Sequence, residues 1–170
     1  MPDGSFVMDS YRIADIIEER HPEPSIHLNT PMQLRFRQIL MNLMRQLTPV
    51  YVPAIAQRIL SNESVDFFTA AREKDIGMPL AKYVEDEEPG AFERAEPFLR
   101  EMTALLNENP SGPYFLGDTI SYTDLIWAAI LLFFESLGDD MYEAFLMRSG
   151  HAAVHRTFLD ALGSLTERNN

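Results

Sequence analysis

The segment from residue 121 to residue 134 constrains the fold of this chain more than any other. Ser121-Tyr122-Thr123-Asp124 has the form of a capping box, in which a hydroxyl and a carboxylate each bind a backbone N–H at the start of a helix. The next ten residues, from Leu125 to Phe134, carry no charge. A helix that is apolar all round must be surrounded by other elements. The segment therefore predicts the buried central helix of a bundle, with Ser121 and Asp124 as a structural cap.

Helical periodicity recurs along most of the remaining chain. Asp9-Ser10 offers an N-cap, and Thr30 is followed by Pro31, a residue that is favoured at the first position of a helix. Pro49 and Pro53 lie within the helical pattern that starts at Thr30 and predict a kink or a break there. Besides the helix from residue 30 onward, we expect helices at 10–19, 64–76, 91–107, 121–136, 141–147 and 152–165.

Two short segments depart from this helical pattern. Asp3-Gly4 is a turn signal, and the apolar run Phe6-Val7-Met8 favours a short β-strand after it. The acidic run from Glu85 to Glu88, followed by Pro89-Gly90, predicts a solvated loop.

The charge balance excludes several classes of partner. The 170 residues include 14 Lys and Arg and 26 Asp and Glu, which gives a net charge of −12 at pH 7. Repulsion opposes binding to nucleic acid and to an anionic membrane surface. The chain has no cysteine, so it holds neither a disulfide nor a thiolate metal site. No segment has the pattern of a signal peptide or a membrane span, and we expect a cytoplasmic protein.

Tyrosine and histidine side chains are the first candidates for chemistry. Tyr51, Tyr114 and Tyr122 each carry a phenol that can transfer a proton, the alternative being a core tyrosine with one satisfied hydroxyl. His151 and His155 stand at i, i+4, a spacing that suits one metal ion, the alternative being two exposed surface histidines. Because no third ligand follows at a recognisable spacing, no metal cofactor is expected.

Several stretches together resemble the glutathione S-transferase superfamily. Tyr114-Phe115-Leu116-Gly117-Asp118, with the capping box after it, is similar to the segment that caps the central helix of its C-terminal domain. Asp3-Gly4, Asp9-Ser10 and Ile13-Ala14 resemble the last strand and helix of its thioredoxin-like domain. Residues 67–77 and 110–124 are similar to the fungal etherase-type branch. The resemblance implies an all-α, glutathione transferase C-terminal-like helical bundle at residues 25–170, preceded by a remnant strand and helix at residues 1–24.

The resemblance also implies binding residues. Asp9 and Ser10 match the pair that contacts the γ-glutamyl end of glutathione, the alternative being a plain N-cap. Arginines in the helix after Thr30 lie where the family lines its electrophile pocket, and an arginine there can bind a carboxylate or pair with the acidic surface. The resembling branch would place the acidic run over the active site, which leaves a lid as an alternative to a loop. The arginines of the helix after Thr30 are Arg35, Arg37 and Arg45. Together with the tyrosines, two of them complete the set of candidate catalytic residues, which are Tyr51, Tyr114, Tyr122, Arg35 and Arg45.

Three functions are compatible with these observations. The first is a glutathione S-transferase-like protein of fungal type that binds a hydrophobic or aromatic small molecule. The second is a repurposed member that performs isomerisation, dehydration or cyclisation without glutathione in secondary metabolism. The third is a non-catalytic binding or interaction module. Because the family's catalytic segment has no counterpart before Asp3, we expect glutathione to bind weakly or not at all.

The same missing segment bears on association. In the family, the helix that carries Ile13, Ile16 and Ile17 packs against a sheet, and these apolar residues remain here. An apolar face without its sheet favours a homodimer, or a partner chain that supplies the missing thioredoxin-like segment.

Overall fold

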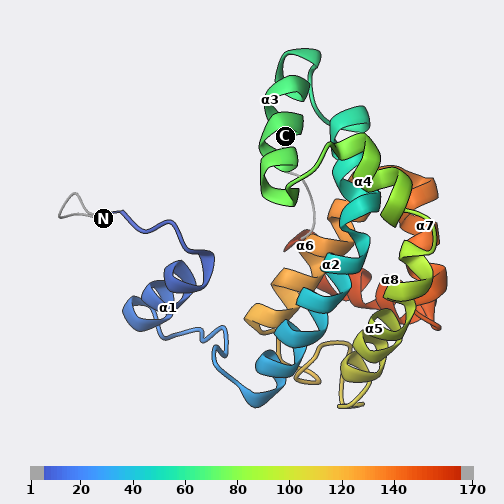
Figure 1. The fold of residues 1–170 in the computed structure, drawn as a ribbon. Helices are drawn as coiled ribbons and strands as arrows, with labels where there is room; N and C mark the ends of the chain where they lie inside the picture. Colours follow the sequence, from blue (N-terminus) through green and yellow to red (C-terminus); the bar gives the residue numbers. More distant parts are fainter. Residues whose placement is uncertain (1–5, 166–170) are drawn as a thin grey trace.

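The computed structural model describes residues 6–165, and regular structure over this range is helical (Figure 1). The helices are α1 (Ser10–Arg20), α2 (Pro31–Arg58), α3 (Asn62–Ile76), α4 (Leu80–Glu87), α5 (Ala91–Leu106), α6 (Tyr122–Ser136), α7 (Asp139–Arg148) and α8 (Ala152–Leu162), with a 3-10 turn at Gly163–Leu165. The all-α fold predicted from the sequence is confirmed. The expected turn at Asp3-Gly4 lies outside the described residues.

The core lies where α6 meets α2, α7 and α8. Trp127 of α6 is fully buried, with its ring 6.4 Å from that of Phe36 on α2 and 5.9 Å from that of Phe145 on α7. Near the end of α6, the ring of Phe134 stacks against that of Phe145, with the ring centroids 4.2 Å apart. The most extensive contact between two helices joins α2 to α5. The apolar segment after residue 121 is thus the buried helix that its sequence predicts.

The start of α6 is held by one carboxylate. The capping box is present, and Asp124 Oδ2 accepts from the N–H of Ser121 at 2.8 Å and from its hydroxyl at 2.6 Å. The other oxygen, Oδ1, accepts from the N–H of Phe115 at 3.0 Å. Asp124 is completely buried, and this burial raises its pKa. The carboxylate therefore fixes both the first turn of α6 and the loop that precedes it.

The predicted break in α2 does not occur. The helix continues through Pro49 and Pro53 as one 28-residue element. Each proline removes one backbone hydrogen bond, but Leu47, Val50 and Val52 around them are buried in the core. This burial outweighs the lost hydrogen bonds, so α2 stays continuous.

Two other predictions are wrong. Phe6-Val7-Met8 forms no strand, and Phe6 and Met8 are 82% and 86% exposed, because none of the described residues offers a neighbouring strand. The acidic run is not a loop, since α4 extends to Glu87. Lys82 Nζ binds both carboxylate oxygens of Asp86 one turn later, at 3.1 and 2.9 Å. This pairing, together with the buried Leu80, stabilises a helix where the charges alone predicted a loop.

Helix α1 stands apart from the bundle in Figure 1, and its only buried residue is Ala14. One of its connections to the core runs through a residue of the linker. Glu18 Oε2 accepts from the N–H of Ile26 at 3.0 Å, and the carbonyl of Ile26 accepts from the N–H of Tyr122 at 2.7 Å. Ile26 therefore links α1 to the first residue of α6.

Candidate functional site

The start of α1 faces side chains from α2 and α6. The guanidinium of Arg37 on α2 lies 3.8 Å from the ring centroid of Tyr11. The ring of Tyr122 meets Tyr11 edge to face, with centroids 5.9 Å apart. Asp9 and Ser10 directly precede Tyr11, as the cap and the first residue of α1. We call Asp9, Ser10, Tyr11, Arg37 and Tyr122 the α1 junction.

The phenol of Tyr122 stays protonated at neutral pH. Burial raises its pKa above the ordinary value of 10.0, and the neighbouring Tyr11 and Asp9 raise it further, while Arg37 acts in the opposite direction. A protonated phenol donates a hydrogen bond but does not take up a proton. Tyr122 can therefore stabilise a negative charge on a ligand, and it is not suited to act as a general base.

Asp9 is the N-cap of α1, as its position in the sequence predicts. Asp9 Oδ1 accepts from the N–H of Arg12 at 2.8 Å. Ser10 is exposed at the first position of the helix. The first N–H groups of a helix and its dipole attract anions. The start of α1 thus presents one hydroxyl and one capped helix end to solvent.

Exposed apolar side chains flank Arg37 on α2. Leu34 and Met41 lie three residues before and four residues after Arg37, so the three share one face of the helix. Leu34 is 61% exposed and Met41 is 68% exposed. On α6, Leu125 lies one turn beyond Tyr122 and is also exposed. The α1 junction therefore adjoins apolar surface that residues 6–165 leave uncovered.

The three tyrosines proposed for chemistry do not come together. Tyr51 packs edge to face on Phe133 at 5.8 Å, and its hydroxyl lies 3.4 Å from Thr48 Oγ1. Tyr114 donates to the carbonyl of Ala161 at 2.8 Å. Of the three, only Tyr122 belongs to the α1 junction. Tyr51 and Tyr114 have the contacts of partly buried structural tyrosines.

The arginines of α2 also separate. Arg35 binds both carboxylate oxygens of Glu108, at 2.9 and 2.7 Å, as expected of a surface ion pair. Arg45 is exposed and reaches Asn42 Oδ1 at 3.5 Å. Arg37, which sequence reasoning did not place among the catalytic candidates, is the one that stacks on Tyr11. Its spacing from Leu34 and Met41 was the signal available in the sequence.

His155 is not on the surface, which corrects the interpretation of the histidine pair. The ring is fully buried, and its Nδ1 accepts from Trp127 Nε1 at 3.1 Å. Because indole only donates, Nδ1 carries no proton and Nε2–H donates to Thr103 Oγ1, 2.8 Å away. Burial lowers the pKa of His155 to about 4. Both ring nitrogens are used, so His155 cannot join His151 at a metal ion.

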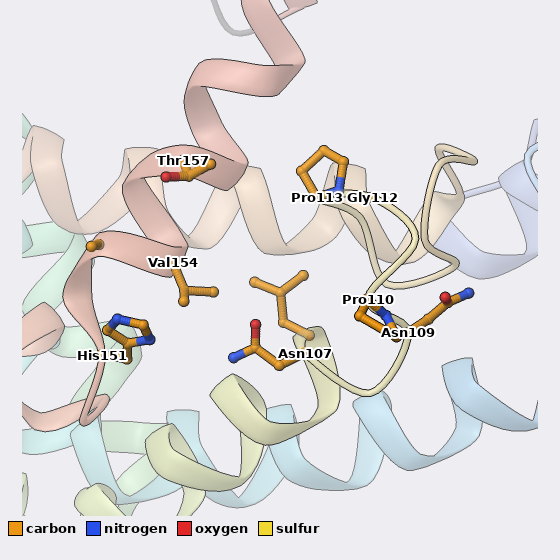
Figure 2. A pocket seen from close by; sticks show the side chains of 10 residues that line it. Asn107, Asn109, Pro110, Gly112, Pro113, His151, Val154 and Thr157 are labelled. Atoms are coloured by element: carbon orange, nitrogen blue, oxygen red, sulfur yellow. The ribbon is translucent and has the colours of Figure 1, made fainter.

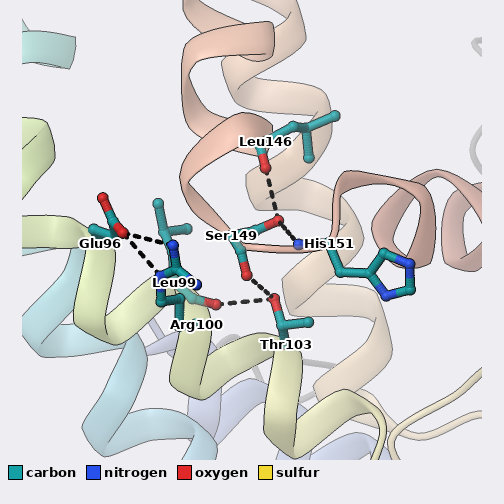
Figure 3. Close-up of polar contacts among 7 residues, drawn as sticks. All are labelled: Glu96, Leu99, Arg100, Thr103, Leu146, Ser149 and His151. Carbon is teal, nitrogen blue, oxygen red and sulfur yellow. Dashed lines mark hydrogen bonds and ion pairs between the residues drawn. The ribbon is translucent and has the colours of Figure 1, made fainter.

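The surroundings of this histidine form a polar network between α5, α7 and α8 (Figure 3). The Thr103 hydroxyl donates to the carbonyl of Ser149 at 2.8 Å. The Ser149 hydroxyl in turn donates to the carbonyl of Leu146 at 2.7 Å and accepts from the N–H of His151 at 3.3 Å. Within residues 6–165, no three His, Asp or Glu side chains are grouped as a metal site would require.

Two pockets lie beside residues discussed above, one at His151 and one at the isoleucines of α1. One of about 470 Å³ opens between the end of α5, the loop after it and the start of α8, where Asn107, His151 and Val154 surround it (Figure 2). The other, of about 380 Å³, lies on the outer face of α1, against Ile13 and Ile17. Neither pocket contains a residue of the α1 junction.

These contacts define an all-α domain built around a capped and fully buried central helix. The sequence model of the family described as glutathione S-transferase, C-terminal domain, matches residues 32–164. The chain belongs to this family. The match runs from α2 to the 3-10 turn and leaves out α1. No curated protein matches the sequence. Over the described residues, no helix is both long enough and apolar enough to cross a bilayer.

Proposed function

We propose that this glutathione S-transferase-like protein is of the fungal type and binds a hydrophobic or aromatic small molecule at the α1 junction. The observation that carries the proposal is the exposed apolar face of α2 beside the start of α1. Leu34 and Met41 are both more than half exposed there, next to side chains that can hold a polar group. The similarity of residues 67–77 to the fungal etherase-type branch supports the choice of branch.

Ser10 supplies the polar end of this proposed site. In the family that the sequence resembles, a serine at this position contacts the γ-glutamyl carboxylate of glutathione. The exposed Ser10 hydroxyl and the first N–H groups of α1 suit such an anion. Tyr122, held protonated by its raised pKa, adds a hydrogen-bond donor to the junction.

Free glutathione is expected to bind weakly at this site. In the family that the sequence resembles, Ser10 and Asp9 match contacts to the γ-glutamyl end alone, so contacts to the cysteinyl and glycyl ends are missing among the described residues. Each missing hydrogen bond weakens binding by about 0.5–1.5 kcal/mol. The apolar surface of Leu34 and Met41 must therefore supply most of the affinity for a complete ligand.

Calorimetric titration with glutathione and with S-hexylglutathione tests the proposal. We expect S-hexylglutathione to bind at least about tenfold more tightly, because its alkyl chain covers apolar surface. Met41→Gln should lower the affinity for S-hexylglutathione, and Ser10→Ala should lower the affinity for both compounds. Met147, a similarly exposed methionine on α7, provides the matched control Met147→Gln. Absence of S-hexylglutathione binding, or equal loss in the two methionine variants, would contradict the proposal.

A further inference from the structure

Arg37 differs from most other arginines of the described chain. Its guanidinium forms no ion pair or hydrogen bond with any residue in the range 6–165, although it is half-buried. Seven arginines do form ion pairs with carboxylates, namely Arg35, Arg58, Arg72, Arg94, Arg100, Arg148 and Arg156. In a chain with 26 acidic residues, a half-buried arginine without a carboxylate requires a reason.

The contact with Tyr11 orients this guanidinium. Arginine presents its five N–H donors in one plane, and a guanidinium over an aromatic ring keeps the donors at its edges available. The nearest candidates for a partner on α1 do not take them. Asp9 Oδ1 is bonded to the N–H of Arg12, and the ion pairs among residues 6–165 include none between Arg37 and either Asp9 or Asp15. The donors of Arg37 are therefore held in place and left for another acceptor.

The face of α2 around Arg37 indicates what that acceptor is attached to. Leu34 and Met41 are exposed one turn before and one turn after it. A planar carboxylate matches the two-pronged geometry of a guanidinium, and an apolar group attached to it would cover both side chains. We propose that Arg37 binds the carboxylate of an amphiphilic ligand whose apolar part lies on Leu34 and Met41. This inference rests on the proposed function for the position of the ligand.

Such a carboxylate has two sources, the hydrophobic molecule itself or the glutathionyl part of a conjugate. The first source is tested with 1-naphthaleneacetate and its uncharged counterpart, 1-naphthaleneacetamide, each titrated into the complete chain. We expect the carboxylate to bind at least about tenfold more tightly than the amide, as a charge-assisted pair implies. Arg37→Gln should abolish this preference. Arg45→Gln, two turns further along the same helix, should retain it.

The second source is tested with S-hexylglutathione on the same variants. A loss of at least about tenfold in Arg37→Gln but not in Arg45→Gln assigns the carboxylate to the glutathionyl part. Arg37→Lys keeps the charge but loses the planar guanidinium, so it should lose an intermediate amount of affinity. It replaces Arg37→Gln in this test if the glutamine variant does not fold. The inference is overturned if the native chain binds naphthaleneacetate no more tightly than its amide and Arg37→Gln does not change the affinity for S-hexylglutathione.

The two proposals fail in different ways. If S-hexylglutathione does not bind while Arg37 still selects naphthaleneacetate over its amide, the glutathione part of the proposed function is wrong and the assignment of Arg37 stands. If Ser10→Ala and Met41→Gln weaken S-hexylglutathione while neither ligand responds to Arg37→Gln, the assignment of Arg37 is wrong and the proposed function stands.

Discussion

The hydroxyl oxygen of Thr103 on α5 lies 2.8 Å from Nε2 of His155 on α8. The other imidazole nitrogen accepts from Trp127 on α6, so a single neutral ring joins three helices. The Thr103 hydroxyl donates a hydrogen bond to the carbonyl of Ser149, between α7 and α8. Every member of this chain of hydrogen bonds has a partner, which is the condition under which a buried polar network stabilises a core.

Replacing Thr103 with valine tests the contribution of that network. The two side chains have nearly the same shape, but valine leaves Nε2–H of His155 and the carbonyl of Ser149 without their partner. We expect the free energy of unfolding to fall by about 2–4 kcal/mol in urea denaturation. Thr103→Ser keeps the hydroxyl and should lose about 1 kcal/mol for the missing methyl group. Equal losses in the two variants would show that the hydrogen bonds contribute nothing.

His155 should make the stability of the fold depend on pH. Its pKa is about 4 in the folded chain, against an ordinary value of 6.5. Between these values the unfolded chain binds a proton that the folded chain does not, so stability is complete above pH 6.5 and is lost as the pH falls toward 4. The loss should amount to about 3 kcal/mol at pH 4. Urea denaturation at a series of pH values measures it.

The variant His155→Gln isolates this dependence, because it removes the titrating group. The raised pKa of Asp124 acts in the opposite sense, since its contribution is lost as the pH rises above 3.8. The difference between the two proteins therefore reports His155. His21→Gln, at an exposed histidine that ends α1, should keep the native slope. A slope between pH 4 and 6.5 that persists in His155→Gln would refute the assignment.

Asp124 should matter more for stability than an ordinary helix cap. Its carboxylate accepts from the N–H and hydroxyl of Ser121 and from the N–H of Phe115, all in the buried interior. A cap contributes about 0.5–2 kcal/mol, and the orphaned N–H of Phe115 adds to that. We expect Asp124→Ala to lower the free energy of unfolding by about 2–4 kcal/mol. Asp124→Asn, which keeps one acceptor, should lose less. An unchanged melting temperature would contradict this account.

The outer face of α1 should drive association of the chain. Ile17 is 51% exposed and lines the pocket on that face with Ile13, so the described chain leaves these residues uncovered. We expect a dimer in light scattering at micromolar concentration, because apolar surface of this kind is seldom left in water. Ile17→Glu should give a monomer. Phe67→Glu, which charges an exposed apolar residue on α3, should not. A monomeric native chain would remove the basis of this prediction.

Sequence reasoning predicted those parts of the fold that depend on neighbours in the chain. The capping box needs only Ser121 and Asp124, three residues apart, and its prediction is confirmed. The bond from Asp124 to the N–H of Phe115 was not predicted, because it depends on how the preceding loop folds back. The strand at residues 6–8 was predicted from composition alone, although a strand forms only beside a partner.

In the candidate site too, sequence reasoning missed the features that depend on contacts between separate helices. His155 was interpreted as exposed from its spacing to His151, while Phe158 and Leu162, three and seven residues later, were the available sign of a buried face. No pattern in the sequence pairs it with Trp127 on another helix. Likewise, the spacing of Leu34 and Met41 places Arg37 on one face of α2, but its contact with Tyr11 arises from the packing of α1.

The two hydrogen bonds of Ile26 have a consequence for the kinetics of ligand binding. When the bond from the N–H of Tyr122 to the Ile26 carbonyl opens together with the contacts of Tyr11 to Arg37 and Tyr122, α1 and the linker can separate from α6 as one unit without disturbing the core. The bond from Ile26 to Glu18 keeps that unit together. A ligand that spans Ser10 and Arg37 then binds only the fraction of molecules in which α1 is docked, and its apparent affinity falls by that fraction. By the same relation, such a ligand should slow hydrogen exchange at the backbone amide of Tyr122, because that N–H is bonded to the carbonyl of Ile26 and not to the ligand.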